Sequence, residues 1–445
     1  MRLVSLLSLS LLVACKSAET DETGETGVVD TGDTDDTDPN DTDPVIVDAD
    51  GDGSMSDVDC DDADPHRFPG NPEVCDAVDN DCDEVIGTDL VTWTSINGVD
   101  TDLTATFLAG TSELAAAYSL ADDGTLRVCG GTWYVNLDVA ADTTLEGFQA
   151  PTLDGVGLTT IAVATGKTLS ASGVAVTSSN FVPSGLRRQI IAGIDLADDT
   201  TLHLADSYVF GSAIGVRVGS GSVVDVTDTE VTGCGTGIVA SVASAMIDIT
   251  GGAFQDCTQS AISSLTVDLL IDGTEFTTNT GGDGGAISQI GGTLTIADTS
   301  FTDNAASGSG GALHLSGVTA NLGSSVFHGN DAFADGGAVH VVAGTYVVDD
   351  CTFEDNSASS GGALGLFSAG PVAGSNTTIT GGSFLRNTAT TSGGAIIADC
   401  SASTVLVAVT FGDAADDNTP TDFFGNSVDA DLDGVVTQTV FSTCD

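Results

Sequence analysis

Carboxylates recur at alternate residues in one short stretch near the N-terminus, DADGDGSMSDVD at 48–59. Hard oxygen donors at this spacing can fold around a hard cation, and Gly53 allows the sharp bend that such a loop needs. The stretch fits positions 1, 3, 5, 7 and 12 of a calcium-binding loop. The predicted ligands are the side chains of Asp48, Asp50, Asp52 and Asp59 and the carbonyl of Ser54. Aspartate at the last position is shorter than the usual glutamate, so we expect weak binding, with a Kd of about 10⁻⁴ to 10⁻³ M.

A second acidic stretch follows directly, DCDDADPHRFPGNPEVCDAVDNDCDEVIG at 59–87. It resembles the bacterial metal-binding motif of the MopE type, which reads D-C-D-D-x-D-P, then P-G-x-x-E-x-C-D, then D-N-D-C-D. The stretch departs from that pattern at Ala77, Glu84 and Gly87. The resemblance implies further metal ligands at Asp61, Asp62, Asp64, Asp76, Asp79, Asp81 and Asp83.

The donor chemistry of both stretches favours calcium as the metal. The MopE family is sometimes labelled copper-binding, but copper prefers imidazole and thioether ligands. His66 is the one histidine in the two stretches, and carboxylates dominate them. We therefore expect a structural Ca²⁺ module over residues 48–87, with a solvated acidic loop that binds no metal as the alternative.

A candidate catalytic set occurs farther along the chain. Polysaccharide lyases and glycosidases pair acidic side chains with a base or an arginine. The candidate residues here are His203, Asp206, Arg217 and Asp228. The two aspartates occupy equivalent positions in successive repeats, as do Asp298 and Asp350 later in the chain. Aspartate often begins turns, so a purely structural role is the alternative.

A pair of histidines, His314 and His340, also occupies equivalent repeat positions. Each lies between two apolar residues of an alternating run, so we expect both rings to point outward from a strand. Two stacked imidazoles could bind a metal weakly, and a solvated ladder of side chains is the alternative.

Short repeats position all of these downstream residues. Two interleaved phrases recur with a period of 22 to 32 residues between 249 and 414: one of alternating apolar residues that contains a phenylalanine, and one that reads Gly-Gly-Ala. The repeated phenylalanines are Phe254, Phe276, Phe301, Phe327, Phe353, Phe384 and Phe411, and the asparagines that follow five of them are Asn279, Asn304, Asn330, Asn356 and Asn387. A fixed period of this length predicts a solenoid, and runs this short and rich in Gly and Thr are strands rather than helices. Stacked coils would place each repeated residue in a ladder, at a strand spacing of about 4.8 Å.

We therefore expect an all-β fold, a right-handed parallel β-helix of roughly 12 coils over residues 126–445 with a C-terminal tail. The Gly-Gly-Ala and F-x-x-N phrases resemble the repeats of bacterial right-handed β-helix proteins, including polymorphic outer-membrane adhesins, over about residues 111–414. In those proteins a helix plugs the first coil. SELAAAYSLA at 112–121, within the connector at 88–125, is the predicted capping helix.

The N-terminus predicts export and a lipid anchor. Residues 1–15 read as a signal peptide, with Arg2 before an apolar run that ends Leu-Val-Ala-Cys. This ending resembles a bacterial lipobox, which implies cleavage before Cys15 and its lipidation. Residues 16–47 are rich in Thr and Asp, contain no aromatic residue and read as a disordered tether. Lys16 follows the cysteine where an aspartate would signal inner-membrane retention, so we expect an outer-membrane protein that faces outward.

Composition narrows the classes of partner. The chain has 65 acidic and 9 basic residues, which gives a formal net charge of −56 at pH 7. Such a charge argues against nucleic acid as a ligand and against binding to anionic lipids by charge.

The ten cysteines agree with an exported protein. Cys234 and Cys257 occupy one ladder position in adjacent coils, so we predict a disulfide between them. Cys60, Cys75, Cys82 and Cys129 are expected to form two bridges of undetermined pairing. Cys400 is expected to pair with Cys444 and join the tail to the last coils, and Cys351 is expected to be free.

Together these features predict a surface-exposed outer-membrane lipoprotein. Its β-helix would act as a non-enzymatic rod for adhesion or for binding an extracellular polysaccharide. A polysaccharide lyase or glycosidase of the β-helix type is the alternative, because the same fold carries both kinds of function.

Overall fold

The structure, a computed structural model, describes residues 46–71, 73, 78–82, 90–179, 191–241, 244–368, 375–399, 402–412, 417–425, 428–430, 432 and 434–441. The chain divides into Met1–Val47 and Asp48–Asp445. The predicted signal peptide, Cys15 and nearly all of the predicted tether lie outside the described residues. So do Asp76, Asp83, Cys75, Cys400 and Cys444.

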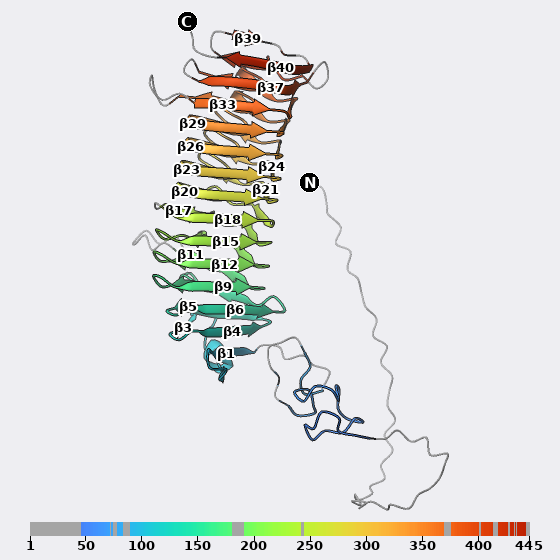
Figure 1. Ribbon diagram of the computed structural model, residues 1–445. Helices are drawn as coiled ribbons and strands as arrows, with labels where there is room; N and C mark the ends of the chain where they lie inside the picture. Colours follow the sequence, from blue (N-terminus) through green and yellow to red (C-terminus); the bar gives the residue numbers. More distant parts are fainter. Residues whose placement is uncertain are drawn as a thin grey trace, which may run out of the picture. The chain divides into compact units, whose positions relative to one another are not determined.

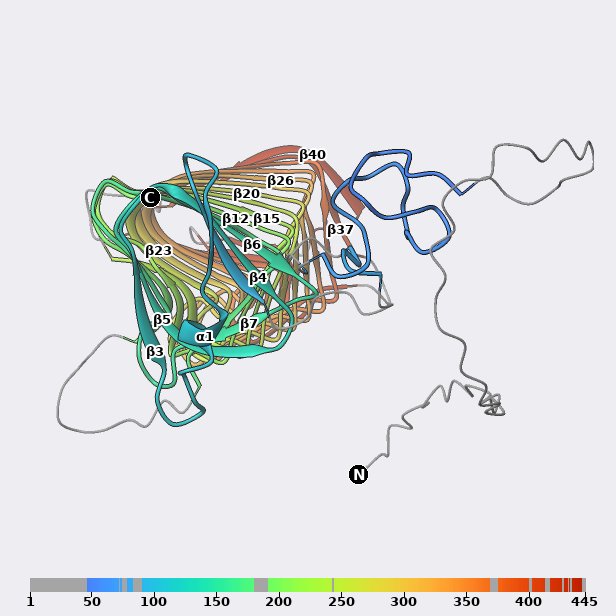
Figure 2. The same ribbon diagram turned by 90° about the horizontal axis from the view of Figure 1, so that it is seen from below.

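Parallel strands from successive coils form a β-solenoid of about eleven turns, so the predicted parallel β-helix is confirmed (Figure 1). Seen along the solenoid, successive coils overlie one another (Figure 2). Each coil contributes short strands to three stacked faces, and corner turns separate the faces.

The first face presents two grooves, which are lined by hydroxyl, imidazole and carboxylate side chains. Its strands are β1 (Val91–Ser95), β4 (Gly124–Cys129), β6 (Thr143–Phe148), β9 (Thr168–Ser172), β12 (Thr201–Ala205), β15 (Val223–Thr227), β18 (Met246–Thr250), β33 (Ser375–Thr380), β37 (Ser403–Phe411) and β40 (Gly434–Phe441). Four long strands belong to both this face and the third: β20 (Ile262–Asp272), β23 (Ile287–Ala297), β26 (Leu313–Gly323) and β29 (Val339–Asp349). All pairs on this face are parallel except β1 with β4 and β37 with β40, at the two ends.

The second face consists of three-residue strands that carry the repeated phenylalanines. They are β7 (Thr152–Asp154), β10 (Ala175–Thr177), β13 (Tyr208–Phe210), β16 (Glu230–Thr232), β19 (Ala253–Gln255), β21 (Glu275–Thr277), β24 (Ser300–Thr302), β27 (Val326–His328), β30 (Thr352–Glu354) and β34 (Ser383–Leu385). The end of β37 continues this face with Phe411, and β5 (Thr132–Val139) begins it and also belongs to the third face.

The third face closes the coil. It contains β3 (Ala116–Leu120), β8 (Ile161–Val163), β11 (Ala192–Leu196), β14 (Ile214–Arg217), β17 (Thr236–Ala240), β32 (Leu364–Phe367), β36 (Ile396–Ala398) and β38 (Phe423–Gly425), which pairs with β39 (Val428–Ala430). A smaller five-stranded sheet follows the corner beside the second face: β22 (Thr280–Gly281), β25 (Ala305–Ala306), β28 (Asp331–Ala332), β31 (Ser357–Ser360) and β35 (Thr388–Ser392).

The predicted phenylalanine ladder is confirmed, and it forms the centre of the core. All seven rings are at most 1% exposed. Neighbouring rings are nearly parallel, with centroids 4.7 to 5.4 Å apart. Each pair of stacked rings contributes about 0.5–1.5 kcal/mol beyond the burial of its area.

The asparagine ladder is confirmed as well, and the structure adds a sixth member, Asn418. The amide nitrogen of each of the first five donates to the Oδ1 of the next asparagine at 2.8 to 3.0 Å. All six also donate to a phenylalanine carbonyl of an earlier coil at 2.9 to 3.0 Å. The ladder therefore satisfies buried backbone groups where the chain turns.

The predicted capping helix at 112–121 is wrong. Ala116–Leu120 instead forms β3, which pairs in parallel with β5, because the hydrogen bonds and burial of the first coil outweigh a modest helix propensity. The N-terminal end is covered by β1, by its antiparallel partner β2 (Asp100–Asp102) and by the one-turn helix α1 (Thr104–Phe107). The buried ring of Phe107 packs against Trp133 and Tyr118, at centroid distances of 6.0 and 6.2 Å.

Candidate functional site

The acidic loop at 48–59 is wrapped by its own carboxylates. Asp48 accepts hydrogen bonds from the backbone N–H groups of Gly51 and Gly53, at 2.6 and 3.1 Å. Asp52 in turn accepts from the N–H of Ser54 at 2.7 Å. Gly51 and Gly53 have φ values of 85° and 101°, a region that favours glycine, so the two glycines permit the tight winding of this loop.

This winding brings the predicted ligands together. Carboxylate oxygens of Asp48, Asp50 and Asp52 lie within 4.8 Å of one another. One oxygen each of Asp50, Asp52 and Asp59 is shielded from solvent and has no hydrogen-bond partner. Burial raises the pKa of Asp50, and the charges of its acidic neighbours raise it further, although a backbone N–H of Asp52 opposes the shift. Such a set of unpaired, mutually repelling oxygens fits a hard cation.

A second carboxylate group lies in the same acidic segment, which we define as residues 48–82. Oxygens of Glu73, Asp79 and Asp81 lie within 4.8 Å of one another. The Oε1 atom of Glu73 accepts hydrogen bonds from the N–H groups of Asn80 and Asp81, at 2.7 and 3.0 Å. Glu73 was not among the ligands predicted from the sequence, although its place in the P-G-x-x-E-x-C-D phrase was the available signal.

The other predicted ligands have different contacts. Asp61 forms an ion pair with Arg67 at 2.7 Å, Asp62 accepts a hydrogen bond from the N–H of Ala49, and Asp64 contacts His66. The structure therefore uses these three aspartates to hold the segment in shape, and it does not gather them with the two carboxylate groups.

A disulfide between Cys60 and Cys82 closes the acidic segment, with a Cα–Cα distance of 5.6 Å. Asp59 lies beside these two sulfurs. Because both sulfurs are in the disulfide, neither is available as a thiolate ligand. Cys129 in β4 is disulfide-bonded as well.

The predicted disulfide between Cys234 and Cys257 is not formed, and both cysteines are free and buried. The two residues do occupy one ladder position, since β16 and β19 pair in register. Side chains in such a ladder run parallel, so their Cβ atoms stay about 4.8 Å apart, whereas a disulfide needs Cβ atoms about 3.8 Å apart. Burial raises the pKa of Cys234 to about 11 and that of Cys257 to about 12, so both thiols are unreactive. Cys351 is free and buried, as predicted.

The candidate catalytic set is not assembled into one site, although Asp206 and Asp228 line the same groove. His203 projects from β12 on the first face, whereas Arg217 lies at the end of β14 on the third face and pairs with Asp195. Asp206 and Asp228 occupy corner turns with φ values of 46° and 44°, and Asp298 and Asp350 have the same conformation. The turn explanation therefore accounts for these aspartates. The acid beside His203 is Asp225 in the next coil, whose Oδ2 is 2.7 Å from its Nδ1. Asp248, one coil beyond Asp225, lines the same groove.

His314 and His340 are stacked in adjacent coils, with ring centroids 5.1 Å apart. The expectation that both point into solvent is wrong for His340, which is 8% exposed and packs against Phe367. Burial and, to a smaller extent, the neighbouring His314 lower the pKa of His340 to about 4.

Two stretches match known protein families. Residues 59–86 match the Cu-binding MopE family, a metal-binding motif. Residues 298–316 match the Chlamydia polymorphic membrane protein repeat. No curated protein and no solved structure matches the chain significantly. In the part of the chain that the structure describes, no helix has both the length and the apolar character needed to cross a bilayer.

Proposed function

We propose that this chain is a lipid-anchored protein of the outer-membrane surface whose β-solenoid serves adhesion through polysaccharide binding. The observation that carries the proposal is the repeat itself: the stretch that matches the polymorphic membrane protein repeat is one turn of a regular, strongly acidic solenoid. The lipobox-like sequence before Cys15 supports the anchor. His203 and Arg217 lie on different faces, and Asp206 and Asp228 serve corner turns, so the candidate residues favour binding over cleavage.

Two measurements on cells test the location. Wild-type protein and a Cys15→Ala variant are expressed in a Gram-negative host, and incorporation of labelled palmitate and digestion by external protease are compared. We expect the wild type to incorporate the label and to be digested on intact cells, and the variant to lose both properties. Protection of the wild type from protease would contradict the surface location.

The acidic segment is proposed to hold structural Ca²⁺. Asp48, Asp50, Asp52 and Asp59, with the carbonyl of Ser54, would supply only oxygen ligands, which suit Ca²⁺ and not copper. The support is the cluster of carboxylates with shielded, unpaired oxygens. The bound ion would neutralise their repulsion and fix the loop.

Titration calorimetry of the full chain with Ca²⁺ and with Cu²⁺ tests this assignment. We expect Ca²⁺ to bind with a Kd on the order of 10⁻⁴ to 10⁻³ M, and the double variant Asp50→Asn/Asp52→Asn to weaken binding by at least about tenfold. Asp64→Asn is the matched control, because Asp64 contacts His66 and not the carboxylate group. Tighter binding of Cu²⁺, or an equal loss in the control, would contradict calcium at this site.

A further inference from the structure

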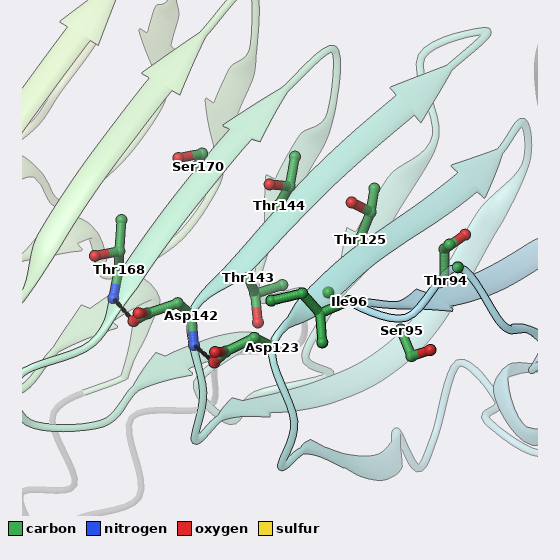
Figure 3. Close-up of a pocket in the computed structure, with 12 residues that line it drawn as sticks. Thr94, Ser95, Ile96, Asp123, Thr125, Asp142, Thr143, Thr144, Thr168 and Ser170 are labelled. Atoms are coloured by element: carbon green, nitrogen blue, oxygen red, sulfur yellow. Dashed lines mark hydrogen bonds between the residues drawn. The ribbon is translucent and has the colours of Figure 1, made fainter.

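A groove of about 590 Å³ lies on the first face near the N-terminal end of the solenoid. Its floor is a row of hydroxyl side chains from four neighbouring strands: Thr94, Thr125, Thr144 and Ser170 (Figure 3). The hydroxyls of Thr125, Thr144 and Ser170 have no hydrogen-bond partner among the described residues. By contrast, the corner hydroxyls of Thr200, Ser207 and Ser325 bond to backbone carbonyls.

The rim of this groove combines an apolar side chain with carboxylates. Ile96, at the β1–β2 hairpin, is 75% exposed and lines the groove. Asp123 and Asp142 lie at the same edge, where the N–H of Ile96 donates to the backbone carbonyl of Asp123 at 3.1 Å. Each carboxylate uses one oxygen to accept a backbone N–H from the next coil, at 3.0 and 2.9 Å. The second oxygen of each carboxylate remains available to accept a hydrogen bond.

The row of outward side chains that contains Thr144 and Ser170 is one column of the first face, and this column continues into a second groove of about 390 Å³. Ser170 is in register with His203, His203 with Asp225, and Asp225 with Asp248. His203 is paired with Asp225, and burial and the charges of Asp225 and Asp272 raise the pKa of Asp248. The next residue of the column is the exposed Leu270, which ends the polar row. From Thr94 to Asp248 the row covers six strand steps, or roughly 29 Å at a spacing of about 4.8 Å.

We propose that this row is the binding track for an extended, uncharged polysaccharide chain that runs along the solenoid axis. The inference rests on the proposed polysaccharide-binding function and assigns its site and ligand class. A polar side chain, either a hydroxyl, an imidazole or a carboxylate, repeats at each strand step, a distance close to the length of one sugar ring in an extended chain. Ile96 supplies an apolar contact for a ring face, so the groove combines the polar and apolar surface that sugars need.

Other polymers fit this surface less well. Asp123, Asp142, Asp225 and Asp248 would repel a polyuronate or a nucleic acid. A peptide that adds as a strand needs a free sheet edge, but the backbone of these strands is paired with the neighbouring coils on both sides. The row therefore selects a ligand that is rich in hydroxyl donors and carries no negative charge.

The test compares isosteric variants of the full chain by affinity electrophoresis and calorimetry. The probes are dextran and hydroxyethylcellulose as neutral chains, a chitosan oligomer as a cationic chain and polygalacturonate as an anionic one. Thr144→Val/Ser170→Ala removes two track hydroxyls without changing side-chain volume appreciably. Its matched control, Thr295→Val/Thr378→Val, removes two hydroxyls from the same outward column beyond Leu270. Ile96→Asn tests the apolar rim.

We expect the wild type to bind a neutral chain, the track variant to weaken that binding by on the order of tenfold, and the control to leave it unchanged. Ile96→Asn should weaken it as well. Unchanged binding by the track variant, or equal losses in track variant and control, would overturn the track but leave polysaccharide binding in place. Binding of only the chitosan oligomer or polygalacturonate would overturn the uncharged ligand. Binding of none of the probes would remove both the track and the proposed polysaccharide-binding function.

Discussion

The solenoid and the acidic segment at 48–82 bury very different groups. In the solenoid, identical phenylalanines and asparagines stack from coil to coil, and the core consists of almost entirely shielded side chains. In the acidic segment, Asn80 is the one buried residue among those described, and no strand or helix is present there. In place of an apolar core, this segment has the Cys60–Cys82 disulfide, the ion pair between Arg67 and Asp61 and two groups of clustered carboxylates. One chain therefore combines a part stabilised by repetition with a part that a disulfide closes and that, in our proposal, a bound cation stabilises.

The largest expected effect comes from a gap in the phenylalanine ladder. Phe327→Ala removes a fully buried ring between Phe301 and Phe353, and we expect the free energy of unfolding to fall by about 3–5 kcal/mol. Val326→Ala, on the exposed side of the same strand, is the control and should change it by less than about 0.5 kcal/mol. Urea unfolding followed by circular dichroism measures both. Equal effects would mean that the ladder is not the stabilising element.

Removal of the Cys60–Cys82 disulfide should affect only the acidic segment. Cys60→Ser/Cys82→Ser removes a cross-link between residues that are 22 positions apart. The unfolded segment then gains conformational entropy, which should lower the stability of the folded segment by about 3 kcal/mol. We expect weaker Ca²⁺ binding and faster proteolysis within the acidic segment, and an unchanged melting temperature for the solenoid. Melting curves and limited proteolysis, with and without chelator, check both parts. A lower melting temperature of the solenoid would show that the two regions do not fold independently.

Acid should destabilise the solenoid through His340. Its pKa of about 4 in the folded chain lies below the ordinary value of about 6.5, so the unfolded chain takes up the proton first as the pH falls. The neutral His340 side chain therefore contributes its full stabilisation above about pH 6.5. This stabilisation is lost as the pH falls toward 4, and about 2 kcal/mol of it is gone at pH 5. In His340→Phe we expect a shallower pH dependence of the urea midpoint between pH 7.5 and 5. A wild type and a variant with identical pH profiles would rule out His340 as the cause.

The smallest effects are expected at the corner turns, where backbone conformation matters more than side-chain chemistry. Asp298 has a φ of 46°, and the equivalent positions of neighbouring coils include Gly273 and Gly381. Asp298→Gly should therefore change the free energy of unfolding by less than about 1 kcal/mol, whereas Asp298→Val should cost about 1–2 kcal/mol. Differential scanning calorimetry of the two variants gives the comparison. A large loss in the glycine variant would assign the carboxylate itself a role.

The sequence alone predicted those features that repetition or a fixed loop spacing encodes. The phenylalanine and asparagine ladders follow from the period, and the gathering of Asp48, Asp50 and Asp52 follows from their alternation. Asn418 was missed because it follows Phe411 by seven residues instead of three.

Two of the three failures have a common physical cause, which is that position along a repeat does not specify direction in space. His203 and Arg217 belong to the same coil, yet they project from different faces. Cys234 and Cys257 are adjacent, but their side chains run parallel. Residues 112–121 show helix-forming composition, which is a weak local preference compared with the strand pairing of the first coil.

The direction of the asparagine ladder has an electrostatic consequence. Every amide donates to the coil that follows, so the side-chain dipoles from Asn279 to Asn418 point the same way and their positive ends face the C-terminal coil. There the last amide donates to the buried carboxylate of Asp422 at 2.8 Å. A row of aligned dipoles that ends on a negative group is the side-chain counterpart of a helix whose N-terminus is capped by an acid. Coils can be inserted or removed within such a row without changing its polarity, but a chain shortened before Asp422 would leave the positive end of the row without its counter-charge.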